Sequence, residues 1–174
     1  MRRFLDMLYE GAGWAAALSI LAICLVVSAQ VGLNVLARVG GPGLSYTIPS
    51  YADFAGFFLA AGTFLALAST LRHGVHIRVT LLVHRLPSRA QWLTELAALA
   101  IGAVMSGYAT LYAALLLAES WHYDDKSPGI IAVPLWIPQI FMVVGLGLLT
   151  VALVDTFIEA LRRRAPVLID AGEA

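Results

Sequence analysis

The chain has 174 residues, of which 60% are apolar and 13% are charged, and its formal net charge is zero. Soluble proteins carry about 25% charged residues, so the composition excludes an ordinary soluble domain and indicates a membrane protein. The zero net charge also argues against nucleic-acid binding, because domains that bind nucleic acids are usually strongly basic.

Four apolar stretches are each long enough to cross a membrane, which takes about 20 apolar residues for a hydrocarbon core of ~30 Å. They leave little chain for a soluble domain. We therefore predict an all-α fold in which residues 1–174 form one membrane domain. Its four transmembrane helices are expected over about 11–37, 51–71, 92–118 and 130–161.

The first span begins like a secretory signal peptide, with two arginines before an apolar run and a weak cleavage pattern at Val27-Ser28-Ala29. Because the apolar run continues to Ala37, we expect it to remain in the protein as a transmembrane helix. Gln30 and Asn34 lie one turn apart near its outer end. We expect these two side chains to hydrogen-bond to other helices rather than to bind a substrate.

A turn-forming connection, Gly40-Gly41-Pro42-Gly43, follows and cannot continue the helix. Asp53 stands at the start of the second span, where two interpretations are open. Its carboxylate either stabilises the positive N-terminus of that helix or forms an ion pair with Arg38 across the connection. Arg38 and Asp53 both lie on the expected outer side, and we treat them as candidate residues of an interface with a partner protein.

The connection after the second span has the pattern of a short amphipathic helix over about 75–86. Its apolar residues recur at helical spacing, whereas its basic residues lie largely off that stripe. Such a helix is suited to lie flat on an anionic leaflet, and an ordinary surface turn is the alternative. The candidate lipid anchors at this interface are Arg72, His76, Arg78, Arg85 and Trp92.

The third span has a small residue at every fourth position, namely Ala98, Gly102, Ser106, Thr110 and Ala114. Such a stripe lets the backbone of another helix approach closely. It serves either packing within this chain or contact with a partner protein. For the second possibility, Gly102 and Ser106 are the candidate interface residues.

Three charged residues, Asp124, Asp125 and Lys126, precede the turn Ser127-Pro128-Gly129 in the third connection. We expect this connection to face outward and its charged residues to contact a partner protein. Pro138 stands near the start of the fourth span, where we expect it to kink or delay the helix.

The positive charges are distributed unevenly between the two sides of the membrane. Nine of the eleven Lys and Arg residues lie in the N-terminal tail, the second connection and the C-terminal tail. The first and third connections hold only Arg38 and Lys126. By the positive-inside rule both termini are cytoplasmic, and we predict a multi-pass protein of a bacterial inner membrane.

No acidic or basic residue falls near the middle of any span. A transporter that couples to an ion by itself normally needs such residues, or broken helices, at mid-depth. Haem ligation is disfavoured because the histidines lie in the second and third connections. With no metal-binding pattern and no nucleophile–base pair, we predict a scaffold or accessory subunit, with no catalytic residues, no metal and no cofactor.

The carboxylates of the fourth span lie close to its inner end. Asp155 and Glu159 are within reach of the arginine clusters, and Glu159 is spaced for an ion pair with Arg163 one turn later. We expect both carboxylates to have a structural role.

Three stretches carry a family pattern: residues 29–38, residues 51–87 with the run Leu71-Arg72-His73-Gly74-Val75-His76-Ile77-Arg78-Val79, and residues 127–145 with Pro134-Leu135-Trp136. Together with the four spans, they resemble the small membrane (Q) subunit of tripartite ATP-independent periplasmic (TRAP) transporters. The chain departs from that pattern at Val39, where the family often has an aromatic residue, and at Thr80, where it commonly has aspartate. It also has Tyr51 and Asp53 where the family usually has tryptophan followed closely by glutamate.

The resemblance implies a division of labour among three components. A large membrane subunit carries the substrate and sodium sites, and a periplasmic solute-binding protein delivers a small organic acid. The Q subunit pairs with the static part of the large subunit, anchors it in the membrane lipids and offers part of the docking surface for the binding protein. The solute is set by the other chains.

Two other functions remain open for a four-span protein of this size. A membrane anchor of a respiratory enzyme would bind haem or quinone, and the histidine positions disfavour haem. A small multidrug-type exporter would require an essential carboxylate in an early span. The first span offers only Glu10 at its inner edge, and the second offers Asp53 at its outer edge.

Overall fold

The computed structural model describes residues 2–41, 43, 46–73 and 87–163. Within these ranges it contains the helices α1 (Arg2–Gly40), α2 (Tyr51–Arg72), α4 (Ser88–His122) and α5 (Trp136–Arg163). All four are long and apolar enough to cross a membrane. This confirms the predicted all-α fold with four transmembrane helices. The predicted interfacial helix over 75–86 lies outside the described residues.

The helices begin and end at positions that differ somewhat from the expected spans. α1 has 39 residues, so at 1.5 Å per residue it is about 58 Å long and extends well beyond a hydrocarbon core. α5 begins at Trp136 rather than near residue 130, because the residues before it form a loop that folds toward α2. Pro138 therefore falls in the first turn of α5, where an N–H would have no intrahelical acceptor.

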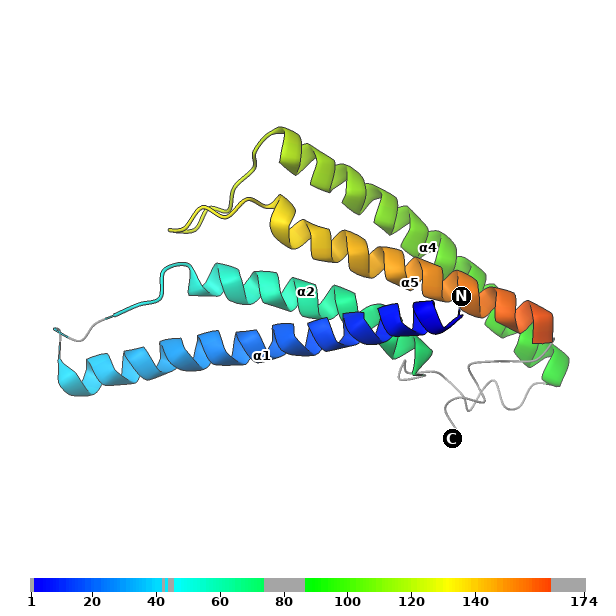
Figure 1. Cartoon of the computed structure of the whole chain (residues 1–174), viewed down its shortest axis with the longest axis horizontal. Helices are drawn as coiled ribbons and strands as arrows, with labels where there is room; N and C mark the ends of the chain where they lie inside the picture. The colour runs from blue at the N-terminus through cyan, green and yellow to red at the C-terminus, as the bar shows by residue number, and fades with distance from the viewer. Residues whose placement is uncertain (1, 42, 44–45, 74–86, 164–174) are drawn as a thin grey trace.

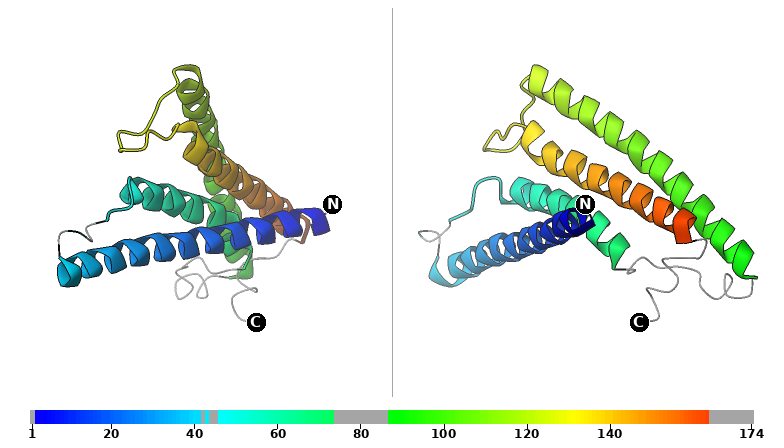
Figure 2. Two further views of the ribbon diagram at one scale, coloured as in Figure 1. Left: turned by 60° about the vertical axis from the view of Figure 1, so that its left-hand side comes forward. Right: turned by 45° about the vertical axis from the view of Figure 1, so that its right-hand side comes forward.

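The helices form two antiparallel hairpins, α1–α2 and α4–α5, which are joined through contacts between α2 and α5 (Figure 1). The order across the molecule is α1, α2, α5, α4, so α1 and α4 are the edge helices. The hairpins converge at the end that holds Arg72 and Arg163, called the inner end below, and diverge toward the opposite, outer end (Figure 2).

The buried core lies toward the inner end, where all four helices contribute to it. Tyr9, Leu71, Leu99 and Leu153, one from each helix, pack in one cluster with three buried alanines. Small side chains let membrane helices approach closely and gain van der Waals contact. Many of the large apolar side chains remain exposed, as expected of surface that faces lipid or other subunits.

Candidate functional site

The contact between α2 and α5 holds the two hairpins together, and we treat it as the candidate functional site. At the inner end, Arg72 meets carboxylates of α5. In the middle, Gly145 meets Phe64, and at the outer end the loop before α5 meets the start of α2. We call these three contacts together the hairpin joint.

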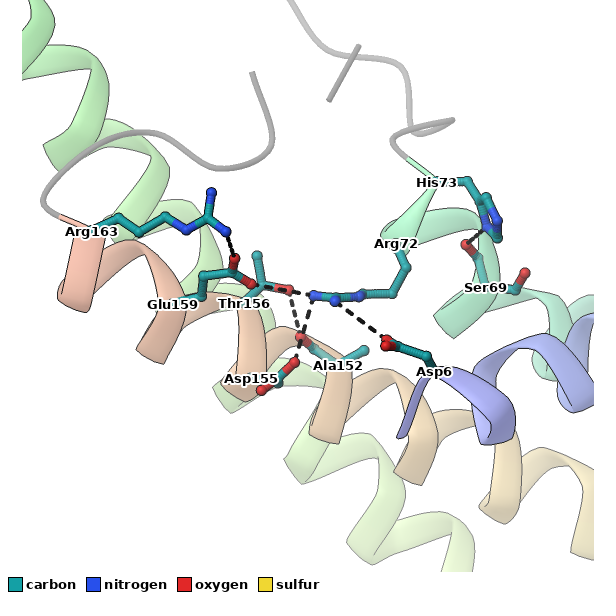
Figure 3. Close-up of polar contacts among 9 residues, drawn as sticks. All are labelled: Asp6, Ser69, Arg72, His73, Ala152, Asp155, Thr156, Glu159 and Arg163. Atoms are coloured by element: carbon teal, nitrogen blue, oxygen red, sulfur yellow. Dashed lines mark hydrogen bonds and ion pairs between the residues drawn. The ribbon is translucent and has the colours of Figure 1, made fainter. Parts of the chain in front are cut away.

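At the inner end, Arg72 extends from the last turn of α2 toward α5 (Figure 3). Its Nη1 lies 3.5 Å from Asp155 Oδ2 and 3.7 Å from Glu159 Oε2. Its Nη2 lies 3.6 Å from Oδ1 of Asp6 on α1. Asp155 and Glu159 are one turn apart on the same face of α5, so one guanidinium reaches both. Arg72 therefore connects three helices.

The burial of these charges makes their pairing consequential. The side chains of Arg72 and Glu159 are only 19% and 10% exposed. Exposed ion pairs contribute ~0–1 kcal/mol, whereas removing one partner of a buried pair leaves the other charge uncompensated in a poorly solvated place. Oε1 of Glu159 also lies 2.6 Å from Arg163 Nη2, which confirms the predicted pair one turn apart.

A hydrogen bond beside this cluster ties α4 to α5. The indole Nε1 of Trp92 donates to the carbonyl oxygen of Ala160 at 2.9 Å. Trp92 and Arg72 were both predicted as lipid anchors, and the structure places both half-buried against protein groups. The other predicted anchors, His76, Arg78 and Arg85, lie outside the described residues.

In the middle of the joint, α2 and α5 meet backbone to backbone. A Cβ atom built on Gly145 of α5 would overlap the carbonyl group of Phe64 on α2, and it would lie 2.8 Å from the Phe64 Cβ. No side chain fits at this position. The close approach depends on glycine, as in other closely packed membrane helices.

At the outer end, the loop before α5 rests on the first turn of α2. The backbone N–H of Ile131 donates to Ser50 Oγ at 2.8 Å. Ser50 precedes α2 with a left-handed backbone (φ 54°), which is uncommon for a residue other than glycine. Gly129 lies so close that a Cβ there would overlap the Asp53 carboxylate. The loop and α2 are therefore in direct contact.

Asp53 lies in the first turn of α2, where a carboxylate complements the positive end of the helix dipole. The alternative interpretation was an ion pair with Arg38. Arg38 is exposed in the last turn of α1, and the described part of the chain contains no ion pair between these two residues.

The outer loop is closed by its own hydrogen bonds. Ser127 is buried, and its Oγ accepts the N–H of Val133 at 3.1 Å and donates to the carbonyl oxygen of Ile131 at 3.2 Å. The N–H of Ser127 also donates to the carbonyl oxygen of Val133 at 2.8 Å. At its tip, Lys126 and Asp124 form an exposed ion pair at 2.8 Å, and Asp125 is exposed beside them.

The central part of the small-residue stripe of α4, from Gly102 to Thr110, packs against α5 within the chain. Thr150 Oγ1 donates to Ser106 Oγ at 3.1 Å and lies 3.2 Å from Thr110 Oγ1. A Cβ on Gly102 would be in ordinary contact with Leu153, at 3.5 Å. Gly102 and Ser106 were candidate contacts with a partner protein. The structure places both in the α4–α5 interface, so they serve packing within the chain.

The expected hydrogen bonds of Gln30 to other helices are replaced by local ones. Its Nε2 donates to Asn34 Oδ1 at 3.0 Å, and its Oε1 accepts the N–H of Ile48 at 2.8 Å. Gln30 is buried. It therefore fixes the connection to α2 against α1 instead of bridging two helices.

The sequence analysis assigned no contact to three residues of the joint, Ser50, Gly129 and Gly145, or to Asp6 of α1, which meets Arg72 beside the joint. The detectable signal was at Gly145, one of two glycines, with Gly147, among the large apolar residues of the fourth span. Asp6 and Ser50 carry no such signal, because their roles depend on residues far away in the chain.

Comparison with known proteins identifies the family. A family model described as the DctQ component of tripartite ATP-independent periplasmic transporters matches residues 23–163, well over half of the chain. Neither the curated proteins nor the solved structures gave a match. The matched range includes the residues of α2, of α5 and of the loop before α5 that form the inner, middle and outer contacts of the hairpin joint. The chain therefore belongs to the DctQ family, the small membrane subunit of TRAP transporters, which is a transporter-component family and not an enzyme family.

Proposed function

We propose that the chain is the static small subunit of a sodium-coupled, binding-protein-dependent transporter that imports a small organic acid. It lies in a bacterial inner membrane with both termini cytoplasmic. It pairs with the large membrane subunit, stays fixed while that subunit moves the solute, and contacts the periplasmic binding protein through its outer loops.

The hairpin joint is the observation that carries this proposal. The two hairpins are held at the inner end by Arg72, in the middle by Gly145 and at the outer end by Ser50. Contacts at three depths oppose both sliding and hinging of one hairpin against the other. Such a body suits a support against which another subunit moves.

The chemistry of the interior supports the same role. In the described helices the charged side chains lie toward the helix ends. The hydroxyl groups of Ser106, Thr110 and Thr150, in the central part of the α4–α5 contact, bond to one another. Ion coupling requires polar or ionisable groups at mid-depth that are available to the ion. We therefore assign the sodium and solute sites to the large subunit.

The outer loop supports a role in docking the binding protein. Its charged residues Asp124, Asp125 and Lys126 are exposed. Its base is fixed to α2 through Ser50 and Gly129. A fixed loop presents its charges in a constant position, which favours electrostatic steering and correct orientation of a partner.

Co-purification tests the pairing. The affinity-tagged chain, expressed together with the product of a neighbouring gene for a large membrane protein, should retain that protein through detergent extraction and size-exclusion chromatography. Recovery of the tagged chain alone would contradict the pairing.

Distance measurements test whether the subunit is static. Spin labels at the exposed positions Val31 of α1 and Val144 of α5 report on the two hairpins. In the reconstituted complex, the distance distribution should be the same with and without sodium and solute. A shift on adding them would contradict the static role.

A further inference from the structure

Two neighbouring tyrosines stand out on the exposed face of α4. Tyr108 and Tyr112 are 63% and 54% exposed, and their ring centroids lie 4.5 Å apart. The remaining four tyrosines stand near helix ends or in the outer connections. These two are therefore the tyrosines of the chain that lie within the central part of a spanning helix.

The positions of two tryptophans on α4 give the depth of this pair. Trp92 and Trp121 lie near the two ends of the helix, where aromatic belts meet the headgroups. Tyr108 is 16 residues after the first and 13 before the second, which is about 24 Å and about 20 Å along the axis. Tyr108 thus lies near the bilayer centre, and Tyr112 lies one turn toward the outer side.

A tyrosine hydroxyl at this depth needs a partner from outside its own helix. Threonine hydroxyls in this protein return to their own backbone, as Thr70 does to the carbonyl oxygen of Ala66 at 3.0 Å. The tyrosine hydroxyl is too far from its own backbone to do the same. The rings of Tyr108 and Tyr112 contact each other, and the described part of the chain gives neither hydroxyl a hydrogen bond to another helix. Lipid chains offer no acceptor for these O–H donors.

The surrounding residues form one continuous exposed face of the helix. Exposed residues three and four positions apart run along this side of α4 through both tyrosines. We call this face, formed by Ala98, Ile101, Met105, Tyr108, Tyr112 and Leu115, the tyrosine face. α4 is an edge helix, and α5 covers its other side (Figure 1).

The large exposed side chains of α1 and α5 at this depth lack such a requirement. On α1 the exposed Leu21 and Leu25, and on α5 the exposed Val144 and Val151, are aliphatic and compatible with lipid. Of the helix faces compared, the tyrosine face is therefore the one whose large side chains call for a protein partner.

Building on the proposed function, we propose that the tyrosine face binds a transmembrane helix of the large membrane subunit. That helix presents a hydrogen-bond acceptor to the tyrosine pair. The large subunit is the occupant because the chain belongs to a multi-component transporter family, so a membrane component must contact it. Lipid and a second copy of this chain are outcomes that the experiment distinguishes.

Site-specific photocrosslinking in the co-expressed complex tests the proposal. A benzophenone amino acid replaces Met105 on the tyrosine face, and Leu25 of α1 and Val151 of α5 are the exposed controls. The Met105 position should give an adduct with the large subunit, and the controls should give mainly lipid adducts. Large-subunit adducts only at a control position, or only a dimer or lipid adduct at Met105, would overturn the proposal.

A hydroxyl deletion tests the hydrogen bond itself. The double variant Tyr108→Phe/Tyr112→Phe keeps both rings and should lower recovery of the large subunit about three- to tenfold, as expected for loss of one hydrogen bond between membrane helices. Tyr123→Phe, at an equally exposed position beyond α4, should leave recovery unchanged. Full recovery with the double variant would overturn the hydrogen-bonding claim. If even the unaltered chain failed to recover the large subunit, the proposed function itself would fail.

Discussion

Gly145 on α5 lies directly against the backbone carbonyl of Phe64 on α2, with no room for a side chain between the two helices. This contact sits between the Arg72 cluster at the inner end and the Ser50 contact at the outer end. It makes the spacing of α2 and α5 sensitive to a single carbon atom.

Replacing Gly145 with alanine should separate α2 from α5. The added Cβ would overlap the Phe64 carbonyl, and overpacking of this kind typically costs ~1–3 kcal/mol. We expect a lower Tm of the purified protein in detergent. Gly147→Ala on the same helix is the control, because its Cβ would meet only Thr110 Cγ2 at 3.8 Å. Equal Tm values for the two variants would show that the close contact is unimportant.

Replacing Arg72 with glutamine should destabilise the inner end. Asp155 and Glu159 would lose a shared positive partner. We expect the free energy of unfolding to fall by about 1–3 kcal/mol, which is less than the cost of breaking a fully buried pair because this cluster is partly exposed to water. Chemical unfolding in detergent measures the change. Arg162→Gln removes the same charge from an exposed position nearby and should have little effect.

Neutralising the carboxylates provides a second check on the Arg72 cluster. The triple variant Arg72→Gln/Asp155→Asn/Glu159→Gln should recover part of the lost stability, since no unpaired carboxylate of α5 would remain at the joint. Asp6 and Arg163, which lose their partners in this variant, have exposed side chains that water can solvate. A triple variant less stable than Arg72→Gln alone would argue against the ion-pair explanation.

Replacing Gly129 with alanine should push the outer loop away from α2. The new Cβ would meet the Asp53 carboxylate, so the bond from the Ile131 N–H to Ser50 Oγ should weaken. Hydrogen–deuterium exchange should then quicken at Ile131. Gly43→Ala in the other outer connection has open space around its Cβ and should leave exchange in residues 123–135 unchanged. Unchanged protection of Ile131 in Gly129→Ala would show that the loop is held by other contacts.

Charge reversal at the loop tip should weaken uptake without dissolving the membrane complex. Asp124→Lys, Asp125→Lys and Lys126→Glu each alter the exposed charge offered to the binding protein. Solute uptake in proteoliposomes containing all three components should fall, while co-purification of the two membrane subunits persists. Glu10→Lys, an exposed reversal at the opposite end, is the control. Normal uptake in all three loop variants would argue against docking there.

The four helices were predictable because hydropathy alone locates long apolar segments. The start of α5 was not, because residues 130–133 are apolar yet belong to the loop. The loop is set by contacts with Ser50 and by the bonds of Ser127, which lie outside any local pattern. The Glu159–Arg163 pair was predictable because it depends only on the spacing within one helix.

The hairpin joint was much harder to predict. Arg72 has the sequence character of a positive-inside anchor, and its carboxylate partners lie on α1 and α5, far from it in the chain. Gly102 and Ser106 fitted two interpretations, and the position of Thr150 opposite Ser106 decides that this part of the stripe faces α5. Sequence spacing identifies a face of a helix, whereas the packing order of the helices determines what that face contacts.

The central claim is that this subunit supports transport without coupling to an ion itself. Sodium-driven solute uptake by proteoliposomes tests it most directly, with the purified chain alone compared with the chain plus the large subunit and the binding protein. The account predicts no accumulation by the chain alone and sodium-dependent accumulation by the complete assembly. Sodium-driven accumulation by the isolated chain would contradict it.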